Sequence, residues 1–213
     1  MTVHTTVHLV RHGEVFNPEK LLYGRLPGYR LSDLGLRMAE RVGEVLSRHD
    51  ITQVIASPLE RAQQTATPLA GLLGLPIGAD DNLLEATNVF EGKRVSVGDG
   101  VLRQPRTWRH LYNPFKPSWG EPYVEVAARM RLAIAAAREA ARGHEAALVS
   151  HQLPIWIARL DAEQRRLWHD PRSRQCSLAS VTSLVFEGDR LVRVDYSEPC
   201  ADLVAVSNKG VGA

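Results

Sequence analysis

The sequence VHLVRHGE at residues 7–14 decides how the rest of the chain is interpreted. Residues 7–10 form a short apolar run, which is typical of a buried strand, and Gly13 marks the point where that strand breaks. Arg11 and His12 therefore stand side by side at the carboxyl end of a strand, where open α/β sheets bind their ligands. A guanidinium can hold phosphate oxygens and an imidazole can attack phosphorus, so the pair predicts a phosphate site.

The rest of the chain alternates predicted strands with predicted helices. Ser32 and Ser57 are expected to cap two helices, because Pro58 and Glu60 follow Ser57 at the spacing of a capping box. This alternation predicts an α/β three-layer sandwich, with a mostly parallel central sheet and helices on both faces. The further strands are expected at residues 53–56, 146–150, 180–186 and 191–196, and the helices at residues 33–48, 58–73 and 123–141.

The length of 213 residues and the hydrophobic content of 44% fit one globular domain. We expect that domain to span residues 1–206 and to be followed by a flexible tail at residues 207–213. Glycine and proline are frequent between residues 80 and 120, which predicts a lid-like insertion at about residues 86–120 rather than a second domain.

Composition and charge narrow the function classes. The net charge of +2 is nearly balanced, so it does not favour nucleic acid or a membrane surface as a partner. The two cysteines, Cys176 and Cys200, do not form a metal-type pair, which favours a reduced, cytoplasmic setting. No segment approaches the roughly 20 apolar residues that span a bilayer. A dimer face on the Ala-rich helix is left open.

Two further residues are predicted to join His12 at the same edge of the sheet. His151 directly follows the strand at residues 146–150, and Arg61 lies in the first turn of the helix that follows another strand. A guanidinium beside free N–H groups at a helix start favours an anion. Each residue alone has an ordinary interpretation, as a loop histidine or a solvated arginine, but their joint placement predicts one anion pocket.

Together these segments resemble the histidine phosphatase superfamily, also called the phosphoglycerate mutase-like family. The resemblance covers about residues 7–160. It rests on LVRHGE at residues 9–14, SPLERAQQTA at 57–66 and VSH at 149–151, with weaker support from LLE at 83–85, FEG at 90–92 and GEP at 120–122.

The resemblance implies a role for each charged residue. His12 would be the nucleophile that takes the phosphoryl group, and Arg11, Arg61 and His151 would surround that group. Fixed positive groups suit this reaction, because negative charge spreads over the equatorial oxygens in the transition state. A neutral His12 is needed for attack, whereas a protonated His151 would suit charge stabilisation, and a nearby phosphate would favour that proton.

The resemblance further implies an acid residue and no cofactor or metal. Glu85 would protonate the leaving oxygen and later activate water. Asp81 and Glu91 lie close in sequence and are kept as alternatives.

The predicted substrate-binding residues follow the family pattern with departures. Asn17 stands one residue early, but its interval to Gly24 is the usual one, so a single residue is missing after Glu14. Gln152 and Leu153 replace a common glycine pair, and the bulkier pair could reshape the pocket. The full predicted set is Gly13, Asn17, Tyr23, Gly24 and Gln152.

Residues 100–120 contain no acidic residue and several basic and aromatic ones. Three interpretations stay open: a basic lid over an acidic substrate, a surface on which nucleic-acid bases stack, and a packed loop. Nucleic acid is the least favoured of the three. The basic residues are Arg103, Arg106, Arg109, His110 and Lys116.

Histidines at every fourth position suggest a metal at first sight. His4, His8 and His12 would share one face of a helix, but the segment is predicted to be extended. Four residues of strand separate side chains by about 13 Å, so one ion cannot bind all three. His49 and His144 are expected to be surface residues near helix ends.

The leading hypothesis is therefore a cofactor-independent phosphatase that hydrolyses a small phosphomonoester through a phosphohistidine intermediate. A phosphoglycerate-mutase-type phosphoryl transfer is the nearest alternative, and a non-catalytic binding or regulatory protein on the same fold is the next.

Overall fold

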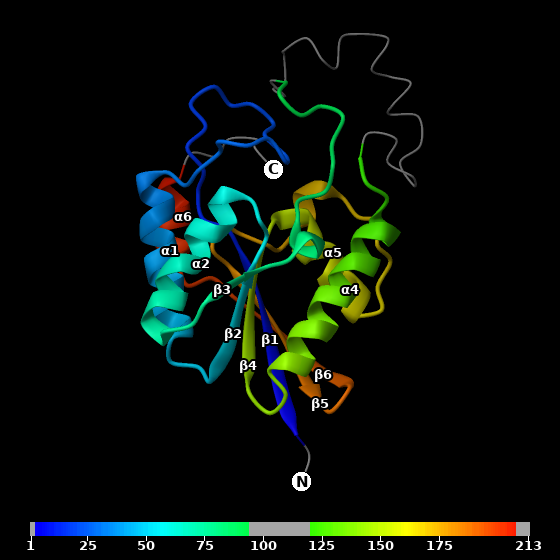
Figure 1. Ribbon diagram of the computed structural model, residues 1–213. Helices are drawn as coiled ribbons and strands as arrows, with labels where there is room; N and C mark the ends of the chain where they lie inside the picture. The colour runs from blue at the N-terminus through cyan, green and yellow to red at the C-terminus, as the bar shows by residue number, and fades with distance from the viewer. Residues whose placement is uncertain (1–2, 94–119, 208–213) are drawn as a thin grey trace.

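A computed structural model describes residues 3–93 and 120–207 and shows a sheet between two helical layers (Figure 1). The strand order is β3-β2-β4-β1-β5-β6. The first four strands are mutually parallel, and β5 and β6 extend the sheet as an antiparallel hairpin. The strands are β1 (His4–Arg11), β2 (Ile51–Ala56), β3 (Ile77–Ala79), β4 (Glu145–Ser150), β5 (Val181–Glu187) and β6 (Arg190–Ser197). The predicted mostly parallel α/β sandwich is confirmed.

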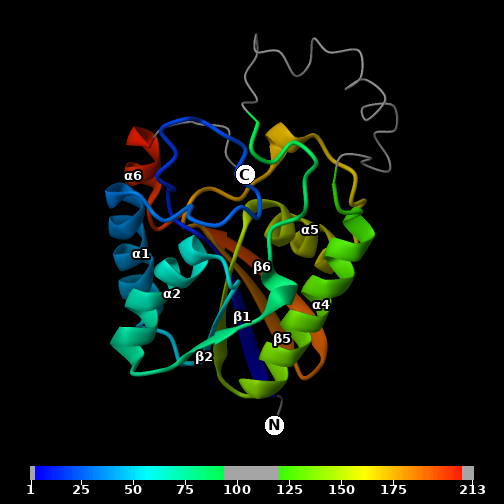
Figure 2. The same cartoon turned by 45° about the horizontal axis from the view of Figure 1, so that its top comes forward.

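Two pairs of helices cover the two faces of the sheet (Figure 2). Helices α1 (Asp33–Leu46) and α2 (Glu60–Leu73) pack together on one face, and α4 (Tyr123–Ala140) and α5 (Gln152–Ala162) pack together on the other. A short last helix, α6 (Ala201–Val206), lies beside α1, to which Asp202 is joined by an ion pair with Arg41. Two short 3-10 helices, η1 (Asp81–Leu83) and η2 (Pro171–Ser173), complete the described elements.

The central strands are buried on both faces, and their side chains alternate between two cores. In β1, Val7 and Leu9 face the core under α4 and α5, whereas Val10 faces the core under α1 and α2. In β4, Leu148 and Val149 divide between the cores in the same way. This double burial is typical of central parallel strands and fixes their register.

The two predicted helix caps have opposite outcomes. The Ser32 hydroxyl accepts a hydrogen bond from the Gly35 N–H at 3.0 Å, so the cap of α1 is confirmed. The predicted Ser57 cap is wrong, because α2 begins at Glu60 with Leu59 at the N-cap and no side-chain cap bond. The Ser57 hydroxyl instead lies 2.9 Å from an imidazole nitrogen of His151.

Strand β3 and helices α5 and α6 were not expected from the sequence, nor were the two 3-10 helices. Strand β3 has only three residues, too few to show a period of two. Helix α5 contains Pro154 near its start and is apolar on most sides, so its sequence shows no clear amphipathic stripe. Most of the predicted lid, the basic stretch at residues 103–116 and nearly all of the predicted tail lie outside the described residues. Among described residues no helix is long and apolar enough to cross a membrane.

A close backbone contact holds the segment after β1 against the start of α1. A Cβ at Gly35 would lie 2.0 Å from the Glu14 carbonyl oxygen, and one at Gly13 would lie 2.6 Å from the Gly35 carbonyl oxygen. The Ser32 N–H donates to the same Glu14 carbonyl at 2.9 Å. Only glycine allows this approach, which sets the path of the chain next to His12.

Gly35→Ala is expected to lower the free energy of unfolding by about 3 kcal/mol, because backbone atoms would have to move apart. Chemical denaturation measures the change. Gly71→Ala is the matched control, since a Cβ there meets nothing within 4 Å. That helical substitution should raise the free energy of unfolding by about 0.4–1 kcal/mol. Equal effects of the two substitutions would contradict the close contact.

Candidate active site

The carboxyl ends of β1, β2 and β4 meet at one edge of the sheet, because β4 lies between the other two strands (Figure 1). Backbone hydrogen bonds continue past the strand ends, from the His12 N–H to the Ser150 carbonyl at 3.1 Å and from the Ser57 N–H to the Val149 carbonyl at 2.9 Å. His12 and His151 are thereby brought together, with ring centroids 5.2 Å apart.

His12 is fully buried and carries one free ring nitrogen. Its Nδ1 lies 2.8 Å from the Gly13 carbonyl oxygen, which can only accept, so we assign the proton to Nδ1. Nε2 then holds a lone pair, and it has no hydrogen-bond partner among the described residues. Burial, together with the positive charges of Arg61 and Arg11, holds the pKa of His12 well below its ordinary 6.5. The ring is therefore neutral at pH 7.

His151 is equally buried, but its other ring nitrogen, Nε2, is the engaged one. Its Nε2 lies 2.9 Å from the Ser57 hydroxyl, and its Nδ1 has no partner among the described residues. Burial and the charge of Arg61 lower the pKa of His151 well below 6.5. In the free protein this ring is therefore neutral, and a proton on it would need an anion nearby.

Two buried guanidiniums flank the imidazoles. Arg11 ends β1 and donates through Nη1 to the Cys176 carbonyl at 2.7 Å. Arg61, in the first turn of α2, donates through Nη2 to the Gly24 carbonyl at 2.7 Å. In both residues Nε has no partner among the described residues, and burial lowers the pKa of Arg61. These N–H groups are desolvated donors that an anion would satisfy.

Tyr23 and Gly24 position the Arg61 side chain. The Arg61 guanidinium carbon lies 4.8 Å from the centre of the Tyr23 ring, which in turn stacks on Tyr29 at 5.0 Å. Gly24 has φ of +41°, and a Cβ there would lie within 2.2 Å of the Glu91 carboxylate. The loop after β1 therefore holds the Arg61 guanidinium in place.

Glu85 brings a buried carboxyl group to the same region. It follows η1, and its Oε1 accepts from the Ala86 N–H at 2.9 Å, whereas Oε2 has no partner among the described residues. Burial raises the pKa of Glu85 above its ordinary 4.5, although Arg61 and Arg174 act in the opposite direction. The carboxyl therefore keeps its proton closer to neutral pH than an exposed glutamate does.

The two alternative acids lie in different settings. Asp81 is exposed at the start of η1. Glu91 is half-buried, accepts from the Asn88 N–H at 3.3 Å and fills the space beside Gly24. Of the three carboxyls, Glu85 alone is buried, and the charge of Arg61 acts on it. Its Oε2 has no partner within the described ranges.

An ion-pair network holds the Glu85 segment in place. Glu121 lies between two guanidiniums, with Arg25 at 3.0 Å and Arg129 at 2.7 Å. Arg25 also donates to the Glu85 carbonyl at 2.5 Å, and Arg129 to the Asn82 carbonyl at 2.5 Å. The GEP motif at residues 120–122 therefore helps to position the carboxyl, through groups that lie far apart in the sequence.

Three predicted substrate-binding residues already have hydrogen-bond partners within the protein. The Asn17 amide closes a turn by bonding both backbone groups of Leu21, at 2.8 and 3.1 Å. The Gly13 N–H donates to the Thr65 hydroxyl at 3.1 Å. Gln152 begins α5 and donates to the Cys176 carbonyl at 3.4 Å, next to Arg11. Their direct contact with a substrate stays a prediction.

Arg174 is a further cation that sequence reasoning missed. It lies in the loop between α5 and β5, where its Nε donates to the His169 ring at 2.9 Å. Burial lowers the pKa of Arg174, while Tyr123 and Glu85 act to raise it, which places the guanidinium near the acid residue. The sequence carries no clear signal for this residue, because no motif marks its loop.

The sequence of the chain matches known proteins over most of its length. Residues 7–198 match the profile of the histidine phosphatase superfamily (branch 1). The chain is 57% identical over 201 residues to the uncharacterized protein Rv0525 of Mycobacterium tuberculosis, covering 94% of this chain and all of that protein. It is 32% identical to the probable phosphoglycerate mutase GpmB of Yersinia pestis, covering 82% of this chain and 83% of that protein.

Solved structures show the same fold. The mycobacterial glucosyl-3-phosphoglycerate phosphatase Rv2419c superposes with a TM-score of 0.73 at 24% identity, covering 91% of this chain and 97% of that one. A phosphoserine phosphatase mutant from Entamoeba histolytica gives a TM-score of 0.74 at 18% identity, covering 92% and 98%. The profile match and the relative at 32% identity establish that this chain belongs to the histidine phosphatase superfamily.

Proposed function

We propose that this protein hydrolyses a phosphomonoester through a phosphohistidine formed at His12. One observation carries the proposal: the ring of a buried, neutral His12 feels the charges of Arg61 and Arg11, and among the described residues neither its Nε2 nor the Nε groups of those arginines have a hydrogen-bond partner. Packing alone does not call for two buried imidazoles and two buried guanidiniums together, because desolvating them is costly. An incoming phosphate would satisfy the unpaired groups.

In the first step, the His12 Nε2 lone pair attacks phosphorus and an N–P bond forms. The ester P–O bond breaks, and the leaving oxygen takes the proton of Glu85, so the products are a phosphohistidine and an alcohol. Arg11 and Arg61 neutralise the charge on the equatorial oxygens, and each such donor typically contributes about 10²–10³ in rate. The dianionic phosphate also favours a proton on His151.

In the second step, water attacks the phosphohistidine. Glu85, now ionised, accepts a proton from that water, the N–P bond breaks, and inorganic phosphate leaves. A group that acts first as an acid and then as a base works best when its pKa lies near the working pH, so that both forms are accessible. The burial that raises the pKa of Glu85 supports this role.

A phosphoglycerate-mutase-type reaction is the second candidate, because the relative at 32% identity is named as a probable phosphoglycerate mutase. The two reactions share the first step and differ in whether water or a substrate hydroxyl receives the phosphoryl group. The lack of a longer arginine-rich segment in residues 86–120 of the sequence favours water.

We further infer that the substrate is a small phosphomonoester with additional negative charge. The charge of Arg174 acts on the Glu85 carboxyl, and Arg25 donates to the Glu85 carbonyl, so both cations lie near the proposed proton donor. The structural neighbours include phosphatases named for glucosyl-3-phosphoglycerate and phosphoserine, which both carry a carboxylate.

Both cysteines are free thiols, which supports a reduced, cytoplasmic setting.

Product analysis with 3-phosphoglycerate and phosphoserine tests the proposal. We expect release of inorganic phosphate and of the dephosphorylated acid, measured by a colorimetric phosphate assay and by chromatography. Accumulation of 2-phosphoglycerate without free phosphate would assign a mutase instead. Turnover of neither these substrates nor an aryl phosphate would favour a non-catalytic binding protein.

A further inference from the structure

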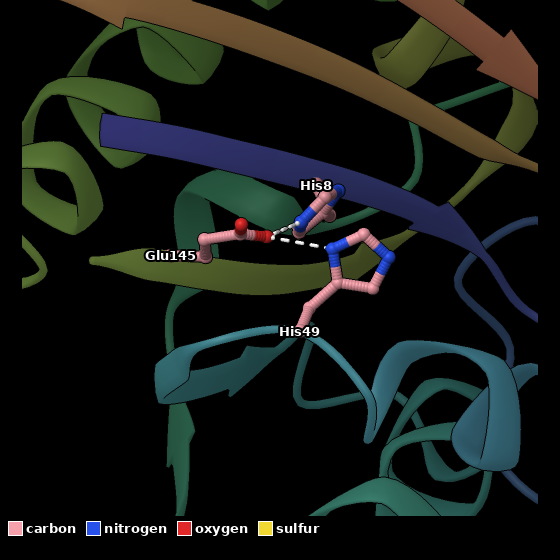
Figure 3. A group of neighbouring side chains, drawn as sticks. All are labelled: His8, His49 and Glu145. Atoms are coloured by element: carbon pink, nitrogen blue, oxygen red, sulfur yellow. Dashed lines mark hydrogen bonds and ion pairs between the residues drawn. The ribbon is translucent and has the colours of Figure 1, made fainter. Parts of the chain in front are cut away.

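We propose that His8, His49 and Glu145 form a Zn²⁺-binding site that is separate from the phosphate pocket. The three side chains come from β1, from the turn between α1 and β2, and from the start of β4, and they point toward one another (Figure 3). One ligand atom from each residue lies within 4.8 Å of the others. The catalytic and binding roles argued above use none of these residues.

Both imidazoles direct a nitrogen at the same carboxylate oxygen. His8 Nε2 lies 2.5 Å and His49 Nδ1 lies 3.0 Å from Oε2 of Glu145. The two rings meet edge to face, with centroids 5.1 Å apart. In a tetrahedral zinc site with bonds of about 2.0–2.1 Å, neighbouring ligand atoms lie roughly 3.3 Å apart. Each imidazole nitrogen would therefore need to move less than about 1 Å away from the carboxylate oxygen to admit the ion.

Burial differs among the ligands in a way that leaves access from solvent. The His8 side chain is 4% exposed, that of Glu145 24% and that of His49 43%. The buried imidazole is thus fixed by the sheet, and the half-exposed one on the turn can adjust. Three protein ligands leave a fourth position of the tetrahedron for water.

The buried ligand is oriented by a second hydrogen bond. His8 Nδ1 lies 2.8 Å from the Ser183 hydroxyl on the neighbouring strand β5. With a metal on Nε2, the ring proton must sit on Nδ1 and donate to Ser183. Such an outer partner, which fixes the tautomer and the ring orientation, is the usual companion of a metal-binding histidine.

The ligand types select the class of metal. Two imidazoles and one carboxylate suit Zn²⁺ and its neighbours Ni²⁺ and Cu²⁺, whereas Mg²⁺ and Ca²⁺ prefer oxygen ligands alone. The ion would join a turn to two strands that are far apart in the sequence, so its binding energy would add to the stability of the fold.

A second histidine–carboxylate pair at the same end of the sheet provides a matched control. His144 pairs with Asp50 at 2.7 Å, and both side chains are more than half exposed. The Glu145 N–H donates to the Asp50 carbonyl at 2.9 Å, so the two pairs are neighbours. The His144–Asp50 pair has the same chemistry as the proposed site but lacks a third ligand in the described structure.

Zinc titration of the untagged full chain, stripped with chelator and followed by calorimetry, tests the site. We expect one equivalent of bound Zn²⁺ and no binding of Mg²⁺. Ser183→Ala should weaken binding by about 10–100-fold, and His49→Asn by more than that. His144→Asn should leave binding unchanged. At 100-fold excess of free Zn²⁺ over Kd, the Tm of the wild type should rise by about 5–10 °C.

X-ray absorption of the zinc complex gives an independent readout. The expected first shell contains nitrogen and oxygen at about 2.0–2.1 Å and no sulfur, because neither cysteine takes part. A sulfur shell, the absence of saturable binding, or equal losses in His49→Asn and His144→Asn would each overturn the proposal. None of these readouts depends on phosphatase activity, so the proposed function and this site can fail separately.

Discussion

His12→Ala is expected to lower kcat for phosphomonoester hydrolysis by at least about 10⁴-fold, because the proposed N–P bond forms at the His12 ring. His12 Nε2 is buried and has no hydrogen-bond partner among the described residues. Steady-state release of phosphate from an aryl phosphate measures the loss. In the wild type, a short reaction with labelled substrate should leave an acid-labile phosphoryl group on the protein, and His12→Ala should leave none.

The control for this substitution is a histidine outside the pocket. His144→Ala removes an exposed imidazole at the other end of the sheet and should not change kcat. Chelator should also leave turnover unchanged, since no step uses a metal, even if it removes zinc from the site proposed above. Equal turnover by His12→Ala and the wild type would reject His12 as the nucleophile.

Glu85→Gln is expected to lower kcat/KM, which reports the first step without dephosphorylation, by about 10²–10⁴-fold for an alkyl phosphate, whose leaving oxygen needs a proton. The loss in kcat/KM should be much smaller for an aryl phosphate with an acidic leaving group, which departs without protonation. Comparing kcat/KM for the two substrates, in the variant and the wild type, isolates the step in which Glu85 donates. Equal losses for both substrates would indicate a general defect of the pocket rather than a missing acid.

The pH profile of kcat/KM supplies a second readout. His12 must be neutral to attack, and its lowered pKa moves the acid limb of the profile below pH 6.5. Glu85 must be protonated to donate, and its raised pKa moves the basic limb to higher pH than an ordinary glutamate would give. The rate should therefore fall as pH rises through the pKa of Glu85. In Glu85→Gln this limb should disappear, because an amide does not titrate.

Two carboxamide variants test the alternative acids. Asp81→Asn should keep nearly full activity, because this side chain is exposed at the start of η1. Glu91→Gln keeps the shape of the side chain beside Gly24 and should also keep the basic limb. A basic limb that disappears in either variant, and not in Glu85→Gln, would move the acid role to that residue.

Much of the fold could be predicted from signals within a few residues of each other in the sequence. Ser32 caps α1 as predicted, because the hydroxyl and the N–H that it accepts from are three residues apart. Arg11, His12 and His151 were found because they stand at or directly after the end of an apolar strand, and parallel strands bring such positions to one edge. The alternation of strands and helices then fixed the class of the fold.

Contacts between distant residues limited the prediction elsewhere. Ser57 has all the local marks of a cap, but His151 takes its hydroxyl, and the pairing of β2 with β4 decides this. His49 was expected to be an ordinary surface residue near a helix end. Its partner Glu145 lies on a strand from the second half of the chain, so no spacing in the sequence could reveal the pair.

The strand order has a consequence for synthesis of the protein. Strand β4 lies between β1 and β2, yet residues 57–144 separate it from β2 in the chain. A ribosome-bound nascent chain that has emerged only as far as α2 therefore contains β1 and β2 but not β4, the strand that pairs with both of them. Unpaired strand edges of this kind invite aggregation, so this interval of translation is when the polypeptide most needs a chaperone.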